Sequence, residues 1–296
     1  MPPPPTDLEP SATYARPTNA NDPSIPSYLA ACKTNNVPLV TQLVRNFERR
    51  DGSLTFGLNN AVTAGHHDVV RALLAMGVKW DAETVNKASA SLHTLQLLVE
   101  FGFEVNDPLP EGCVLLRAVV AHNDEATIRW LLEQGADPNL GAPLNSQETI
   151  PWRIRPVQDS GAALNACARS SSPDIFQLLL SHGAKLENAV PLHMAAGVGP
   201  EVPPGGRIPM MKYLVGLGID VNSMDDAMKQ GEHGQGQWGT PLQYAIVWHR
   251  IEEAKWLLQH GADVDKLLPG GFTTRQYIQR RQPEMGSLIS AHSQQS

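Results

Sequence analysis

The feature that most constrains this chain is a short phrase that recurs along it. An apolar pair, usually Leu-Leu, is followed after two or three residues by glycine, and then by a small or apolar residue and an acidic or polar one. The phrase is most complete at Leu131–Asn139, Leu214–Asn222 and Leu257–Asp265. Shorter copies place the same glycine at Gly77, Gly102 and Gly183. Such recurrence indicates repeated units, each burying its apolar face against its neighbours.

A second phrase precedes the first at a fixed distance. It is clearest at Gly239–Ala245, which contains Thr-Pro-Leu, and nearly as clear at Val190–Ala196. Thr240 lies 21 positions before Gly261, and Ala162 lies 21 positions before Gly183. Threonine and proline favour the start of a helix, whereas glycine favours the left-handed conformation that ends one. Each unit is therefore predicted to contain two helices between these signals.

Together the two phrases resemble the ankyrin repeat, whose signature joins T-P-L-H-x-A to a G-A-D-x-N turn with a period of about 33 residues. The resemblance implies an all-α ankyrin-repeat solenoid of about seven helix-turn-helix repeats plus a C-terminal cap, with short loop or β-turn fingers. We expect the repeats over about 26–51, 54–81, 82–108, 110–140, 161–189, 190–222 and 239–268, and the cap over 269–290.

The expected domain organisation is simple. A disordered Pro-rich tail is predicted over 1–25, a single repeat domain over 26–290, and a frayed tail over 291–296. Three insertions interrupt the repeats, at about 140–160, 197–209 and 224–238.

Composition argues against several classes of function. The net charge of −7 does not favour nucleic acid, which needs clustered Lys and Arg. Three widely spaced cysteines favour reduced, buried thiols. No run of apolar residues reaches the length of a membrane helix, and no secretory signal opens the chain. We expect a cytoplasmic location, with the nucleus as the alternative.

Residue patterns for chemistry are weak. The ten histidines are spread along the chain, and none pairs with a cysteine or another histidine at zinc-ligand spacing. His193 takes the histidine position of the second phrase, which starts the first helix of a unit and is called the start phrase below. We therefore expect a structural role for it. The Gly-rich stretch 231–238 lacks the Lys-Ser/Thr pair of a phosphate-binding loop. We predict no catalytic residues, no cofactor and no metal.

Tryptophan and arginine, which are enriched where proteins bind one another, define the candidate partner-binding residues. Trp152, Arg153 and Arg155 lie together in the first insertion. The ankyrin resemblance implies that loop tips and the ends of first helices line the concave binding face. That criterion adds His122, Arg169, Trp238 and Trp248. The alternative for the tryptophans in the insertions is that each packs its own insertion against the stack.

The leading hypothesis is therefore a protein-interaction scaffold or regulatory adaptor, monomeric and without enzyme activity. It would bind a protein partner, and neither nucleic acid nor membrane. The competing hypotheses are an enzyme or a small-molecule sensor, with a pocket formed by the insertions at 140–160 and 197–238. The polar candidates of the enzyme's pocket would be Met224, Asp225, Asp226, Glu232 and His233.

Overall fold

The computed structural model describes residues 24–45, 47, 52–142, 154–226 and 238–288. They belong to two compact units. Unit 1 takes the described residues within 1–119, 126–136 and 148–156, and unit 2 takes those within 120–125, 137–147 and 157–296. Each unit is described by itself below, and the expected single domain over 26–290 stays a prediction.

Unit 1 is built from pairs of antiparallel helices joined by short turns. The pairs are α1 (Ser24–Lys33) with α2 (Val37–Val44), α3 (Gly52–Thr63) with α4 (His67–Ala75), and α5 (Ala82–Ala88) with α6 (Leu92–Glu100). The short helix η2 (Pro110–Gly112) precedes a fourth pair, α7 (Leu115–Ala121) and α8 (Glu125–Glu133), most of which belongs to this unit.

Unit 2 continues the same pattern. Its pairs are α9 (Ala162–Ser170) with α10 (Pro173–Ser181), α11 (Pro191–Ala196) with α12 (Ile208–Gly216), and α13 (Pro241–Val247) with α14 (Ile251–Gln259). The short helix η4 (Leu186–Asn188) precedes α11, and α15 (Thr274–Arg281) with η6 (Pro283–Met285) ends the unit. The described residues thus contain seven helix pairs and a terminal helix, as predicted.

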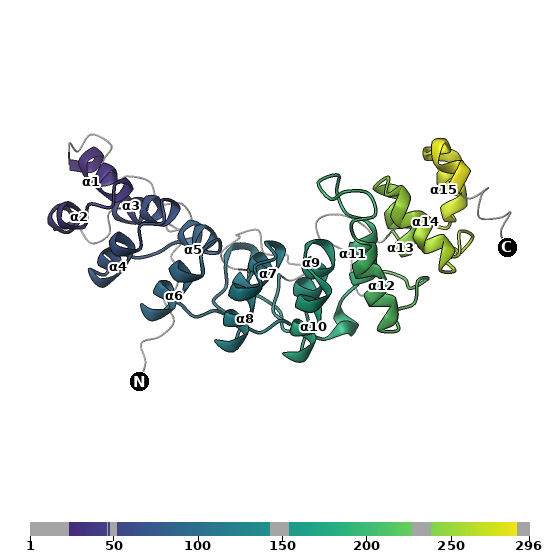
Figure 1. The fold of residues 1–296 in the computed structure, drawn as a ribbon, viewed down its shortest axis with the longest axis horizontal. Coiled ribbons are helices and arrows are strands. Elements are labelled where there is room, and N and C mark those ends of the chain that lie inside the picture. Colours follow the sequence, from purple (N-terminus) through teal and green to yellow (C-terminus); the bar gives the residue numbers. More distant parts are fainter. Residues whose placement is uncertain (1–23, 46, 48–51, 143–153, 227–237, 289–296) are drawn as a thin grey trace. The chain divides into compact units, whose positions relative to one another are not determined.

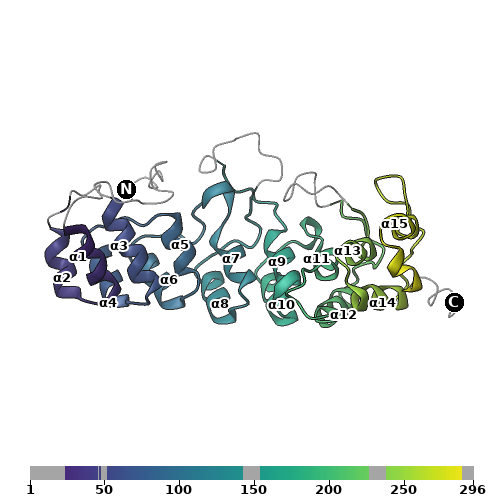
Figure 2. The ribbon, with the colours of Figure 1, turned by 90° about the horizontal axis from the view of Figure 1, so that it is seen from above.

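Within each unit, the first helices of the pairs pack in one row and the second helices in another (Figures 1 and 2). In unit 1, α1 contacts α3 and α3 contacts α5, while α2, α4 and α6 form a parallel row. In unit 2, α11 lies between α9 and α13, and α10 contacts α12. The apolar pairs of the recurring phrase fill the space between rows; Leu73, Leu98 and Leu179 are fully buried. Regular structure in the described part is helical, with isolated bridges at Gly141–Val157 and Leu267–Thr273.

The helix ends follow the chemistry that the phrases predict. Thr240 caps α13 by accepting the Gln243 N–H, and Pro241 occupies the first turn. Gly183 and Gly261 follow α10 and α14 with φ of +88° and +89°. A Cβ at either glycine would meet no atom within 4 Å, so the backbone conformation alone requires glycine there.

The asparagine that ends the recurring phrase links one repeat to the next. The Asn222 side chain donates to the Gly261 carbonyl oxygen at 2.9 Å and accepts the Asp263 N–H at 2.7 Å. Asn139 makes the same pair of bonds to Gly183 and Lys185. The turn glycines therefore lie at points where adjacent loops are bonded together.

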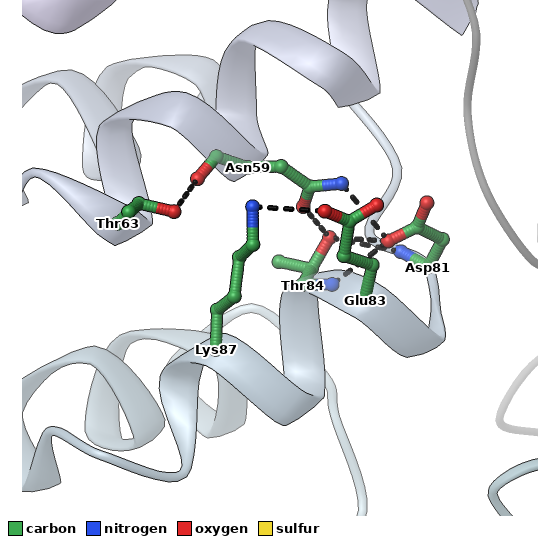
Figure 3. Close-up of polar contacts among 6 residues, drawn as sticks. All are labelled: Asn59, Thr63, Asp81, Glu83, Thr84 and Lys87. Carbon is green, nitrogen blue, oxygen red and sulfur yellow. Dashed lines mark hydrogen bonds and ion pairs between the residues drawn. The ribbon is translucent and has the colours of Figure 1, made fainter.

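A buried polar network joins two repeats of unit 1 (Figure 3). Asn59 of α3 donates to the Asp81 carboxylate at 3.3 Å and accepts from the Thr84 hydroxyl. Asp81 is itself the N-cap of α5 and accepts the Thr84 N–H at 2.8 Å. All three side chains are buried. Because burying polar groups is costly unless they are hydrogen-bonded, these bonds define how the two repeats meet.

Candidate protein-recognition surface

Three aromatic side chains come together at the start of repeat seven. The ring centroid of Trp238 lies 5.1 Å from that of Tyr244 and 6.4 Å from that of Trp248. Tyr244 is buried, whereas Trp248 is 37% exposed and Trp238 is partly exposed. The two tryptophans predicted as partner-binding residues are therefore neighbours, and each keeps part of its surface free for contact.

Asp225 holds the backbone beneath this cluster. Its Oδ2 accepts the N–H of Trp238 at 2.7 Å, the N–H of Gly239 at 3.1 Å and the Tyr244 hydroxyl at 2.8 Å. The carboxylate is fully buried. Since Asp225 and Trp238 stand at the two ends of the third insertion, this residue fixes the point where the insertion leaves and rejoins the stack.

His193 supports the cluster from α11. Its ring centroid is 5.2 Å from that of Tyr244, and its Nε2 lies 3.1 Å and 2.9 Å from the carbonyl oxygens of Ser223 and Gly239. Burial lowers the pKa of His193 to about 4, against the opposing effect of the Asp225 charge. The ring is therefore neutral near pH 7 and donates through Nε2, which confirms the structural role expected for it.

The second insertion, between α11 and α12, is held by two arginines. Arg207 donates to the carbonyl oxygens of Ala168 at 2.6 Å and Ser171 at 2.7 Å, at the end of α9. Cations are favoured at a helix C-terminus. From the other side, Arg250 donates to the carbonyl oxygens of Val202 and Pro203, both at 2.8 Å. These bonds give the insertion a defined conformation.

Arg250 also belongs to a buried ion pair. Its Nη2 lies 2.9 Å from Oε1 of Glu253, and the two side chains are 6% and 0% exposed. Breaking such a pair is costly because it leaves a charge without compensation in a poorly polarisable environment.

Arg169 adds a cationic group on the other side of α11. Its Nη2 lies 3.2 Å from the Met194 sulfur, and the side chain is exposed. Gly197, directly after α11, has room for no side chain without crowding Trp248 and Tyr244. Arg169 and Trp248 therefore flank α11. We call Arg169, Trp238 and Trp248 the recognition surface.

Of the remaining predicted partner-binding residues, two lie within the described part of the chain and two do not. His122 is exposed in the turn between α7 and α8, and Arg155 is exposed within the first insertion. Trp152 and Arg153 lie outside the described residues.

The structure places the candidate residues of the enzyme hypothesis in surroundings that differ from the pocket which that hypothesis assumes. Asp225 is occupied by structural bonds, and Glu232 and His233 lie outside the described residues. A cleft of about 320 Å³ is lined by residues within 186–193 and 219–224; of the residues over 197–238 that the hypothesis names as a pocket, it takes Ile219, Asp220, Ser223 and Met224. No three His, Cys, Asp or Glu side chains gather as a metal site would require in the part of the chain described.

The three cysteines are free; Cys32 and Cys167 are buried, as predicted, whereas Cys113 is partly exposed, so burial was wrongly predicted for it. Burial raises the pKa of Cys32 to about 11 and that of Cys167 to about 12. Both thiols therefore stay protonated and unreactive near neutral pH.

Sequence reasoning missed one pairing of histidines. The rings of His67 and His93, at the starts of α4 and α6, stack with centroids 4.2 Å apart. Burial, followed by the charge of His93, lowers the pKa of His67. The two residues are neighbours because equal positions of adjacent repeats face each other, and the repeat register is the signal that could have paired them.

Comparison with known proteins agrees with the repeat pattern. Residues 164–267 match the family model described as ankyrin repeats (3 copies). Two curated relatives, ankyrin repeat and SOCS box protein 6 of Pongo abelii and of Homo sapiens, are each 28% identical over 150 residues. The match covers 48% of this chain and 31% of each relative, so it spans less than a third of their length.

Solved structures of similar type exist. The human ASB11 ankyrin repeat domain aligns over 90% of this chain and 96% of its own, with 17% identity and a TM-score of 0.43. The ankyrin repeat domain of Bcl-3, described as a unique member of the IkappaB protein family, aligns over 80% of this chain and 84% of its own, with 18% identity and a TM-score of 0.45. Among the helices described here, none combines the length and apolar character needed to cross a membrane.

Proposed function

We propose that this ankyrin-repeat protein is an interaction scaffold or regulatory adaptor that binds a protein partner through the recognition surface of Arg169, Trp238 and Trp248. The observation that carries the proposal is the packing of Trp248. Its ring is supported by Trp238 and by the backbone at Gly197, yet remains 37% exposed. A rigid aromatic side chain loses little conformational freedom on binding, and Trp and Arg dominate interface hot spots.

The family gives the coarse part of this function, because ankyrin repeats generally mediate interactions between proteins. The names of the curated relatives pair ankyrin repeats with a SOCS box. Whether a partner of theirs is shared is part of the proposal's test. For this chain we further propose a monomer located in the cytoplasm or nucleus, without direct contact to nucleic acid or membrane.

A site-specific cross-linking experiment tests the surface. A photoreactive phenylalanine analogue replaces Trp248 in one variant and Leu217 in another, and both are expressed in cells. Leu217 is a matched control, since it is 40% exposed but lies in the turn after α12, the second helix of its pair. We expect a discrete adduct from position 248, absent from position 217, and lost again when Arg169→Ala is added.

Two results would count against the proposal. Adducts of equal size and yield from both positions would mean that contact is not specific to the recognition surface. An adduct from position 248 that survives Arg169→Ala unchanged would remove Arg169 from the surface. Circular dichroism of each variant shows whether the helices are retained.

A further inference from the structure

The cleft of about 320 Å³ in unit 2 has a chemistry that the recognition surface does not use. One wall comes from the loop that leads through η4 into α11, and the other from the loop after α12. Most of the lining is apolar, contributed by Leu186, Ala189, Val190, Pro191, Leu192, Ile219 and Met224. Its volume is at the lower end of the roughly 300–1,000 Å³ of small-molecule sites. It therefore suits one large side chain better than a larger ligand.

The charged groups that line the cleft are both anions. Glu187 and Asp220 supply exposed carboxylates, one on each wall. Asp220 uses Oδ1 to accept the Asn222 N–H at 2.9 Å, which leaves its other oxygen for a further bond. No lysine or arginine lines the cleft; Lys185 precedes its first wall in the sequence, and the Lys266 ammonium group donates to the Asn222 carbonyl oxygen of the other wall at 2.6 Å.

His193 and Ser223 complete the polar lining of the cleft. His193 is 1% exposed and lines the cleft, and its Nε2 proton is directed at the carbonyl oxygens of Ser223 and Gly239. Its Nδ1 makes no hydrogen bond of good geometry among the described residues, although the Val190 backbone lies beside the ring. The Ser223 hydroxyl likewise has no hydrogen-bond partner among the described residues. A buried acceptor without a partner favours a ligand that brings hydrogen-bond donors.

We propose that this cleft receives a lysine or arginine side chain of the protein partner. The aliphatic stem would lie against the apolar lining, and the cationic head would pair with Glu187 and Asp220, since long basic side chains place stem and head in such different surroundings. The inference rests on the proposed function. The cleft and the recognition surface are linked through packed side chains. His193 lines the cleft, its ring contacts Tyr244, and Tyr244 packs on Trp238.

The test uses a small probe and does not depend on knowing the partner. The protein is labelled with ¹³C at its methionine methyl groups, and Met224 provides a signal inside the cleft. N-acetyl-lysine methylamide is titrated into the full chain, with N-acetyl-norleucine methylamide as the uncharged probe of equal stem. We expect the Met224 signal to shift with the lysine probe and to respond weakly to norleucine.

Carboxylate variants supply the matched control. Glu187→Gln combined with Asp220→Asn should weaken the lysine response about tenfold, the size expected when two exposed ion pairs are lost. Asp263→Asn should leave it unchanged, since Asp263 makes the same turn bond as Asp220, to the Asp265 N–H at 2.8 Å, but does not line the cleft.

The outcomes separate this inference from the proposed function. A Met224 signal that does not move, or that moves equally with norleucine or in the double carboxylate variant, overturns the cation site even if position 248 cross-links to a partner. A selective lysine response supports the cation site even if that cross-link is absent, in which case the recognition surface fails by itself.

Discussion

Replacing His193 with glutamine should make the protein less sensitive to acid. Glutamine can still donate to the carbonyl oxygens of Ser223 and Gly239, as His193 Nε2 does, but it does not titrate. Gln243 already occupies the equivalent position of repeat seven, where it is buried. The substitution therefore removes a proton-binding group while retaining a side chain that the fold accepts.

The size of the change in the free energy of unfolding follows from the lowered pKa of His193. Burial lowers the pKa of His193 from 6.5 to about 4. Between these values the unfolded chain binds the proton and the folded chain does not. The contribution of His193 to stability is therefore complete above about pH 6.5 and falls by about 1.4 kcal/mol per pH unit below it. The whole loss by pH 4 is about 3 kcal/mol.

Urea denaturation followed by tryptophan fluorescence at pH 7.5, 6.5, 5.5 and 4.5 measures the effect. Other groups titrate in both proteins, so the informative quantity is the difference in the free energy of unfolding between wild type and His193→Gln. We expect this difference to change by about 1.4 kcal/mol per pH unit below 6.5, in favour of the variant. Parallel pH profiles would refute the conclusion that His193 is buried in the neutral form.

Three further substitutions test the packing. Gly57→Ala should destabilise unit 1 by about 1–3 kcal/mol in urea denaturation, because its Cβ would overlap the buried ring of Tyr28; an unchanged midpoint would mean that the ring has room to move. Arg250→Met should cost about 3–5 kcal/mol by leaving Glu253 buried and unpaired, and adding Glu253→Leu should restore the part that comes from the unpaired charge, while the bonds to Val202 and Pro203 stay lost; no recovery in the double variant would contradict that cause. Asn59→Ala should cost about 1–3 kcal/mol and speed amide hydrogen exchange at the start of α5, whereas unchanged exchange would assign the network no role in joining the repeats.

The arrangement of helices could be predicted from the sequence because local chemistry sets each helix end. Glycine at position 183 or 261 requires the left-handed turn, and Thr-Pro at 240–241 requires a helix start. Both signals act within a few residues, so no knowledge of the tertiary structure was needed. The recurrence of the signals then fixed the pairing of helices.

The candidate site could be predicted only in part. Trp238 and Trp248 were identifiable singly, but their contact depends on Asp225, which reaches across the third insertion to the Trp238 N–H. No local pattern encodes a bond between residues so far apart in sequence. The same is true of Arg207 and Arg250, whose partners are carbonyl groups of other loops.

The sequence also contains a signal for the buried polar bonds between repeats, namely a polar residue that recurs at one position of the first helices. Asn59, Asn165 and His193 each stand at the fourth position of a start phrase, among apolar neighbours. A polar residue that recurs at a buried position of a helix needs a partner outside that helix. The structure supplies the partner each time from residues that follow the second helix of the same pair, at Asp81 and Thr84, at Val190, and at Ser223 and Gly239.

These bonds give the stack a direction. In each case the buried side chain belongs to the first helix of a pair, and the group that satisfies it follows the second helix of that pair. During synthesis from the N-terminus, a helix pair therefore emerges before the atoms that its buried polar side chain requires. A chain cut after residue 189 would keep Asn165 but lose the Val190 N–H. A chain beginning at residue 190 would instead leave that N–H at a helix start, where water can reach it. A cut between two repeats therefore leaves an unsatisfied buried side chain on the N-terminal piece and not on the C-terminal one.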